Sequence, residues 1–139
     1  MRADDPTGFS YALLRLVPRV ERGEQINVGV IVFSRPLGFL EARTALDDAR
    51  VLALWTDVDL HVVREHLRAV ERIAGGDPSA GPIAKLDLTA RFHWLVSPSS
   101  TIIQPSDVHA GLCGDPGAEL AKLFGELVLV PARTGFEPG

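Results

Sequence analysis

Three arginines, Arg15, Arg19 and Arg22, lie close together near the N-terminus. A guanidinium group presents a rigid fork of donors that suits bidentate contacts with a carboxylate or a phosphate. The polar residues that could pair with them within the chain are Glu21, Glu24 and Asn27. An arginine on an apolar strand face needs a carboxylate, a carbonyl or an external anion, because an unpaired buried cation is costly. Arg15 is therefore the main candidate for anchoring a ligand, and Arg19, Arg22 and Asn27 are candidate ligand or partner contacts.

A second group of polar side chains lies between Ser97 and Asp115, in a stretch interrupted by Gly and Pro. Its candidate contacts are Ser100, Thr101, Gln104 and His109. Loops on a rigid sheet commonly carry binding residues, but Ser and Thr also satisfy local backbone groups in turns and caps. Both interpretations stay open. In the first, Arg15 would form one pocket for a small anion together with Ser100, Thr101 and His109.

Nothing in the sequence indicates a catalytic centre. Cys113 is the single cysteine, and a cysteine nucleophile needs a nearby base and a lowered pKa. His109 could reach it only within a helix, which Gly111 and Gly114 disfavour, so we expect Cys113 to be a small buried apolar residue. The four histidines have no zinc-ligand spacing, and phosphate loops, nucleophile elbows and kinase motifs are missing. The sequence thus predicts no catalytic residue, no metal and no cofactor, and it disfavours an enzyme.

Charge and composition limit the classes of partner. The chain has 139 residues with 14 Lys or Arg against 18 Asp or Glu, a formal net charge of −4. No global positive field would attract phosphates, which disfavours nucleic-acid binding. The N-terminus does not resemble a signal peptide, and the apolar runs are far shorter than the roughly 20 residues that span a bilayer. We therefore expect a cytoplasmic protein without a membrane partner.

The elements that must position these side chains begin with a sheet. Aromatic, aliphatic and β-branched residues fill segments 9–19, 26–34 and 39–44, with turn-forming Gly and Pro residues between them. This pattern is typical of three strands in an antiparallel meander. Segment 101–104 is predicted to be a fourth strand, and 105–117 a polar loop.

Helical spacing of apolar residues follows in the middle and at the end of the chain. Helices are predicted near 48–55, at 88–96 and at 118–130, with another that Asp57 or Asp59 caps and that ends at Gly75 and Gly76. Trp55 and Trp94 are expected in the core, with a contribution of either to an interaction surface as the alternative.

The predicted fold is a single α+β domain over residues 9–130. It consists of an antiparallel sheet of about four strands, with helices from the middle and the end of the chain packed mainly on one face. Residues 1–8 and 131–139 are expected to be flexible termini.

Two stretches of the sequence resemble the signature segments of the DUF3037 family of small bacterial proteins. They are YALLRLVPRVERGEQINVGVIVFSR at 11–35 and RFHWLVSPSSTIIQPSDVHAGLC at 91–113. The residues that fall in the order of the family are Arg15, Arg19, Glu21, Arg22, Asn27, Gly29, Ser100, Thr101, Gln104 and His109. Ser99 stands where many relatives are expected to carry a basic residue, so the resemblance implies no phosphate site at that turn.

The resemblance implies no established activity. It does imply a genetic neighbourhood shared with HipA-like serine/threonine kinases, and hence a companion or regulatory role. We therefore expect a non-enzymatic interaction partner, with a HipA-like kinase as the candidate protein partner, acting through segments 15–27 and 100–109. The alternative is a small enzyme or anion-ligand-binding protein that uses the pocket described above. Exposed strand edges would also permit a homodimer.

Overall fold

The computed structural model describes residues 6–98 and 101–129. Its first three strands are the predicted antiparallel meander, made of β1 (Thr7–Leu16), β2 (Ile26–Ser34) and β3 (Phe39–Thr44). The one-turn 3-10 helix η1 (Val20–Arg22) lies between β1 and β2. Strands β2 and β3 match their predicted bounds, because each is a short β-branched or aromatic run bounded by turn residues.

Two short strands complete the sheet along the other edge of β1. β4 (Ile103–Pro105) and β5 (His109–Cys113) both pair antiparallel with β1, which gives the described residues a five-stranded sheet with the order β3-β2-β1-β4 and β5 also on β1. The predicted fourth strand is therefore confirmed. The expectation of a polar loop throughout 105–117 is wrong. His109–Cys113 forms a strand because it pairs with the free edge of β1, a segment that is distant in sequence.

Ser106 bridges the gap between these two edge strands. β4 pairs with β1 from Leu14 onward and β5 pairs with it up to Tyr11. At the intervening Leu13, the backbone N–H donates to Ser106 Oγ over 2.8 Å, and the Ser106 N–H donates to the Leu13 carbonyl over 2.8 Å. Ser106 is buried. The two bonds thus satisfy backbone groups for which burial without a partner would be costly.

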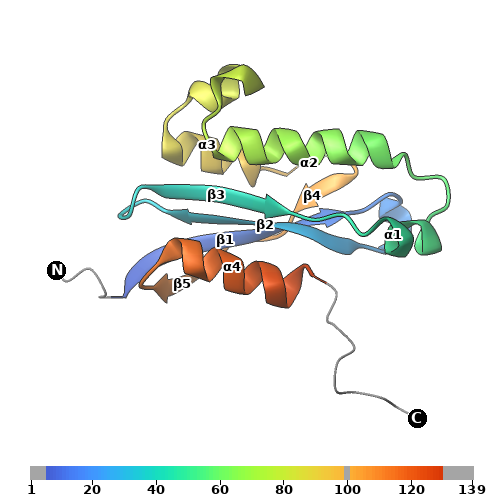
Figure 1. Ribbon diagram of the computed structural model, residues 1–139, viewed down its shortest axis with the longest axis horizontal. Coiled ribbons are helices and arrows are strands. Elements are labelled where there is room, and N and C mark those ends of the chain that lie inside the picture. The colour runs from blue at the N-terminus through green and yellow to red at the C-terminus, as the bar shows by residue number, and fades with distance from the viewer. Residues whose placement is uncertain (1–5, 99–100, 130–139) are drawn as a thin grey trace, which may run out of the picture.

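Helices cover both faces of the sheet (Figure 1). The helices are α1 (Asp48–Leu54), α2 (Leu60–Ala74), α3 (Leu88–Leu95) and α4 (Pro116–Leu127). α1, α2 and α3 contribute to the core on one face, whereas α4 packs on the other. The α+β class and the antiparallel sheet are confirmed, but the expectation that the C-terminal helix joins the others on one face is wrong. β1 and β2 are apolar on both sides, so each face requires a cover.

A bulge determines which residues of β2 reach each core. The register between β1 and β2 shifts between Leu14 and Arg15, and Val28 is the extra residue on β2. As a result Val30 lies in the core under α4, whereas Val28 lies in the core under α2. Gly29 follows the bulge and lies opposite Leu14, where a Cβ would come within 3.0 Å of the Leu14 side chain and 3.2 Å of a backbone carbonyl. Its lack of a side chain therefore permits the close approach.

Each α-helix begins at an aspartate whose carboxylate accepts a backbone N–H of the first turn. These caps are Asp47, Asp59, Asp87 and Asp115. For α2 the cap is Asp59, which leaves the side chain of Asp57 available for another contact. The predicted end of α2 at Gly75 is confirmed. No described helix is long and apolar enough to cross a membrane.

The two tryptophans differ in burial. Trp55 is 5 % exposed, as predicted, but Trp94 is 49 % exposed. The prediction of a core Trp94 is wrong because α3 turns Phe92 and Leu95 toward the core instead.

The ends of the described chain differ in part from the predicted bounds. β1 begins at Thr7, so Thr7 and Gly8 belong to the sheet and not to a separate N-terminal segment. α4 is predicted at 118–130 and spans Pro116–Leu127. The flexibility expected for 1–5 and for 131–139 concerns residues outside the described ones.

The Ser106 bridge yields a stability prediction. The substitution Ser106→Ala removes the acceptor of a buried backbone N–H, so we expect the free energy of unfolding in urea to fall by about 1–3 kcal/mol. Ser97→Ala is the matched control, because Ser97 is exposed and its hydroxyl only donates to the His93 carbonyl; its effect should stay within about 0.5 kcal/mol. Equal effects of the two substitutions would contradict the role given to Ser106.

Candidate functional site

Two adjoining hollows lie at the end of the sheet where the chain leaves β1. Their volumes are about 460 and about 420 Å³, and Arg19 and Asp57 line both. We call their combined lining the Arg19–Asp57 surface. It comprises Pro18, Arg19, Glu21, Arg22, Glu24, Leu54, Trp55, Thr56, Asp57, Val58, Asp59, Val62 and Ile102.

Two connections bring these residues together. The first links β1 to β2 through η1, after which Gly23 takes a φ of 71°, a left-handed conformation that glycine adopts without strain. The second links α1 to α2. Trp55, at the end of α1, is buried in the core beneath the sheet end, so it fixes this connection against the body of the domain.

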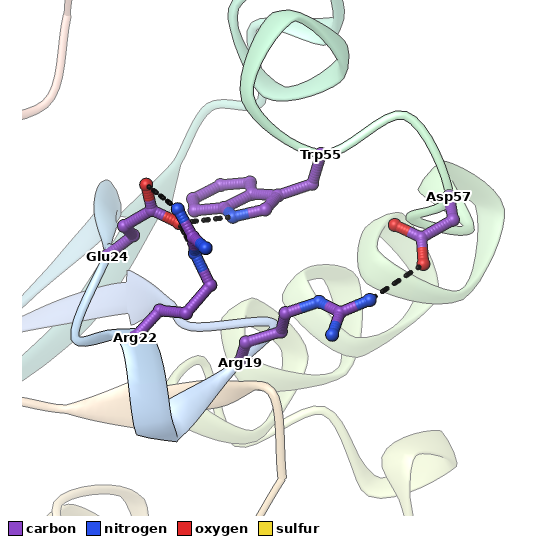
Figure 2. A network of polar contacts seen from close by, with 5 residues as sticks. All are labelled: Arg19, Arg22, Glu24, Trp55 and Asp57. Carbon is purple, nitrogen blue, oxygen red and sulfur yellow. Dashed lines mark hydrogen bonds and ion pairs between the residues drawn. The ribbon is translucent and has the colours of Figure 1, made fainter.

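Polar contacts join the two connections (Figure 2). Arg22 donates to both carboxylate oxygens of Glu24, with Nε–Oε1 2.7 Å and Nη2–Oε2 3.3 Å. The indole Nε1 of Trp55 donates to the same Oε1 over 3.4 Å. Beside them, Arg19 Nη2 lies 3.7 Å from Asp57 Oδ2. Both Arg–carboxylate pairs are solvated at the surface of the domain.

These contacts determine the charge state of the surface. The hydrogen bonds from Arg22, and secondarily from Trp55, hold the pKa of Glu24 below its ordinary value. Glu24 is therefore an ionised acceptor at neutral pH and has no proton to donate. The residues that line the two hollows include one hydroxyl, that of Thr56, and no histidine or cysteine. The lining thus offers no histidine or cysteine side chain as a base or nucleophile.

Exposed aliphatic side chains accompany the charges. Leu54 and Val62 line the hollows with exposed fractions of 54 % and 52 %. Val20 does not line the hollows, but it lies in η1 directly after Arg19 and is 66 % exposed, so we count it with this surface from here on. The surface is therefore a mixture of paired charges and accessible apolar groups.

Two of the predicted contact residues, Arg19 and Arg22, belong to this surface, and two others from the first segment do not. Arg15 lies opposite Asn27 on one side and Gln104 on the other, half-buried, and its Nε is buried without a hydrogen bond. Asn27 Nδ2 donates to the Leu127 carbonyl over 3.0 Å. Asn27 thus attaches the end of α4 to the sheet.

The predicted residues of the second segment have local partners. Thr101 Oγ1 donates to the Ile103 carbonyl over 2.8 Å, and Gln104 Nε2 donates to the Thr101 carbonyl over 3.1 Å. The ring of His109 lies 5.1 Å from that of Tyr11, centroid to centroid. Ser100 lies outside the described residues.

The structure does not bring Arg15, Thr101 and His109 into one pocket. His109 is opposite Tyr11, four residues before Arg15 on β1, a separation of roughly 13 Å along a strand. Thr101 lines a different hollow together with Leu14, whose side chain is on the other face of β1 from that of Arg15 by alternation.

Three residues of the surface escaped the sequence-based prediction of a site. Trp55 was expected mainly as a core residue and Glu24 as a partner of the arginines, while Asp57 was one of two candidate caps for α2. Because only one aspartate can cap the first turn of α2, the Asp-Val-Asp sequence signals that the other is free for a different contact. Which partner it would meet depends on the packing of α1, a tertiary property.

Other candidate chemistry is limited. Cys113 is buried as predicted, and burial raises the pKa of its thiol, so the reactive thiolate is disfavoured. Within residues 6–98 and 101–129, no group of three or more His, Cys, Asp or Glu side chains could hold a metal ion.

The Arg22–Glu24 pair leads to a pH prediction. Arg22→Gln should raise the pKa of Glu24 toward its ordinary value, as measured by NMR titration of the side-chain carboxyl. Because the folded-state pKa is depressed, the pair stabilises the fold above the unfolded-state pKa, and this contribution is lost as the pH falls through the folded-state pKa. Arg68→Gln, which removes a comparably exposed pair with Glu65, should leave the Glu24 titration unchanged. A Glu24 pKa that is insensitive to Arg22→Gln would show that the pair does not form in solution.

Comparison with known proteins identifies the family. No curated protein and no solved structure is significantly similar to the chain. Residues 11–128 match the family described as "Protein of unknown function (DUF3037)", a match that covers most of the chain, begins within β1 and includes every later element through α4. The resemblance seen in the two signature segments is thereby confirmed, and the chain belongs to the DUF3037 family.

Proposed function

We propose that this chain is a non-enzymatic interaction partner of another cytoplasmic protein and that the Arg19–Asp57 surface is its binding site. The observation that carries the proposal is the exposure of Val20, Leu54 and Val62 around charge pairs that can exchange partners. Protein interfaces combine an apolar centre with a polar rim and are enriched in arginine.

The Arg19–Asp57 pair supports recognition more than stability. Its side chains are 56 % and 74 % exposed, with N and O 3.7 Å apart. Exposed pairs of this kind contribute about 0–1 kcal/mol to folding. Arg19 and Asp57 can therefore leave each other for a carboxylate and a cation of a partner at little cost. Charges that are complementary across an interface determine orientation and exclude wrong partners.

The geometry gives the enzymatic alternative no comparable support. The side chains that would build its pocket are distributed along β1 and over two faces of the sheet. The hollows of the Arg19–Asp57 surface hold two Arg–carboxylate pairs, and the side chains of both pairs are accessible to water. Catalytic electrostatics depends on groups that are preorganised in a water-excluded site.

The family context leads us to propose a HipA-like serine/threonine kinase as the partner. Its binding face would offer a carboxylate to Arg19, a cation to Asp57 and an apolar group to Val20. Such a contact would act by occluding or positioning the kinase. This assignment of the partner rests on genetic association, whereas the assignment of the surface rests on its exposed residues and charges.

The proposal is tested by titrating the full chain against a HipA-like kinase from the same host, using calorimetry. We expect saturable binding that Val20→Asp weakens about tenfold or more, equivalent to ~1.4 kcal/mol. Leu37→Asp is the matched control, because Leu37 is also exposed, at 42 %, but lies in the β2–β3 turn; it should bind like the wild type. Equal weakening by both variants would place the interface elsewhere, and no binding by the wild type would exclude this kinase.

A charge exchange separates recognition from folding. Arg19→Glu combined with Asp57→Arg keeps an ion pair within the chain but reverses both signs toward a partner. We expect the unfolding midpoint in urea to stay near that of the wild type and the affinity for the partner to fall. If the double variant kept the affinity of the wild type, the partner would not contact the Arg19–Asp57 pair. Should the kinase not bind, quantitative co-purification from the native host with wild type and Val20→Asp decides whether another protein recognises the surface.

A further inference from the structure

The outer edge of β5 presents unpaired backbone groups. Leu13 directs its N–H and carbonyl away from β2 toward Ser106, so by alternation Tyr11 and Phe9 also direct theirs toward β5. Their partners in the register are His109 and Gly111. The residues of opposite parity on β5, Ala110 and Leu112, therefore direct their N–H and carbonyl groups outward. No hydrogen bond within the described residues occupies these groups.

Apolar side chains accompany this edge. Leu112 is 71 % exposed, more than any other large hydrophobic side chain described, and Val108 is 46 % exposed. Both have the parity of the exposed Ala110, so the three lie along one side of the segment. The segment 108–113 reads VHAGLC and contains neither a proline nor a side chain that is permanently charged.

The opposite edge of the sheet, formed by β3, is protected from pairing with another strand, unlike the edge formed by β5. The outward N–H of Thr44 on β3 donates to Glu71 Oε2 over 3.0 Å, and its hydroxyl donates to the same oxygen over 3.0 Å. Glu41 and Arg43 add charges to that strand. On the β1 side, Pro105 ends β4. Proteins commonly block free edges by such charges, prolines and covering contacts. Within the described part of the chain none of these protects β5, as expected of an edge that another strand covers.

We propose that β5 pairs antiparallel with β5 of a second copy of this chain, about a twofold axis at Ala110. In this register Val108 lies opposite Leu112 of the second copy, and Ala110 lies opposite itself. All three residues have the parity whose backbone groups point outward, so hydrogen bonds form on both sides of the axis. The segment is thus complementary to itself: its two large exposed aliphatic residues meet across the strands, and no like charges are brought together.

The pairing would join two five-stranded sheets into one continuous sheet. β5 lies at the opposite end of β1 from the Arg19–Asp57 surface (Figure 1). The dimer therefore leaves that surface free on each copy, and the inference is independent of the proposed function. An isologous twofold contact is also the commonest form of soluble oligomer.

Sedimentation velocity of the full chain over a wide range of concentration tests the proposal. We expect a reversible dimer for the wild type and a monomer for Leu112→Lys, which adds a charge to the edge while removing a side chain that the monomer leaves exposed. Leu37→Lys changes another exposed leucine outside the edge and should remain dimeric. A wild-type chain that stays monomeric overturns the proposal, as does a dimer that Leu112→Lys leaves intact.

Oxidative cross-linking tests the register. Opposed residues of a hydrogen-bonded antiparallel pair have Cα atoms about 5.5 Å apart, within the range of about 4.4–6.8 Å that a disulfide spans. Ala110→Cys should therefore form a covalent dimer on mild oxidation, whereas Leu37→Cys should not. The native Cys113 is buried and gives the background level in the wild-type chain. A dimer that Leu112→Lys dissociates but Ala110→Cys fails to cross-link would overturn the axis at Ala110.

Discussion

The hydrogen bonds between Ser106 and Leu13 hold together the part of the fold on which the rest depends. β1 is the strand that β2, β4 and β5 all contact, and its second edge is completed by two short strands that are separated by a turn. Without Ser106, the N–H and carbonyl of Leu13 would be buried at that turn without hydrogen-bond partners. The free-energy cost would be a large fraction of the stability of an ordinary domain. Ser106 supplies both the acceptor and the donor. It thereby allows one edge of β1 to support two strands whose free sides have different properties.

The two-sided burial of β1 and β2 explains the arrangement of helices and of the candidate site. A sheet that is apolar on both faces needs a helical layer on each, and the bulge at Val28 redistributes the residues of β2 between the two cores. Asn27, next to the bulge, then attaches the end of α4. With both faces and one edge occupied by packing, the loops at the end of the sheet remain accessible. Arg19 and Asp57 meet there because the end of β1 and the connection from α1 to α2 lie at the same end of the molecule (Figure 2).

Local sequence patterns predicted most helices and strands, whereas β5 and the position of α4 depend on contacts with residues far away in the sequence. β2 and β3 were predicted to the residue, and α2 was predicted with its end at Gly75, because turn residues, caps and periodicity lie within each segment. β5 escaped prediction because HAGLC becomes a strand only through pairing with β1. The location of α4 depended on a second apolar face that a helical period does not reveal. The exposure of Trp94 likewise depended on which side of α3 met the sheet.

The same distinction applies to the candidate site. Arg19 and Arg22 could be predicted because guanidinium groups near a turn need partners, and Glu24 lies within reach along the chain. The sequence could not assign Asp57 as the partner of Arg19, because the two residues come together only when Trp55 packs into the core and places the α1–α2 connection beside β1. The pocket expected around Arg15 does not form, for a geometric reason. His109 pairs with Tyr11, four residues before Arg15 on β1, and Thr101 lies on the other face of the sheet. Sequence order therefore identified chemical types correctly but not their assembly. That assembly places exchangeable charges at one end of β1 and an uncharged strand edge at the other, so the two ends differ in the kind of surface each can recognise.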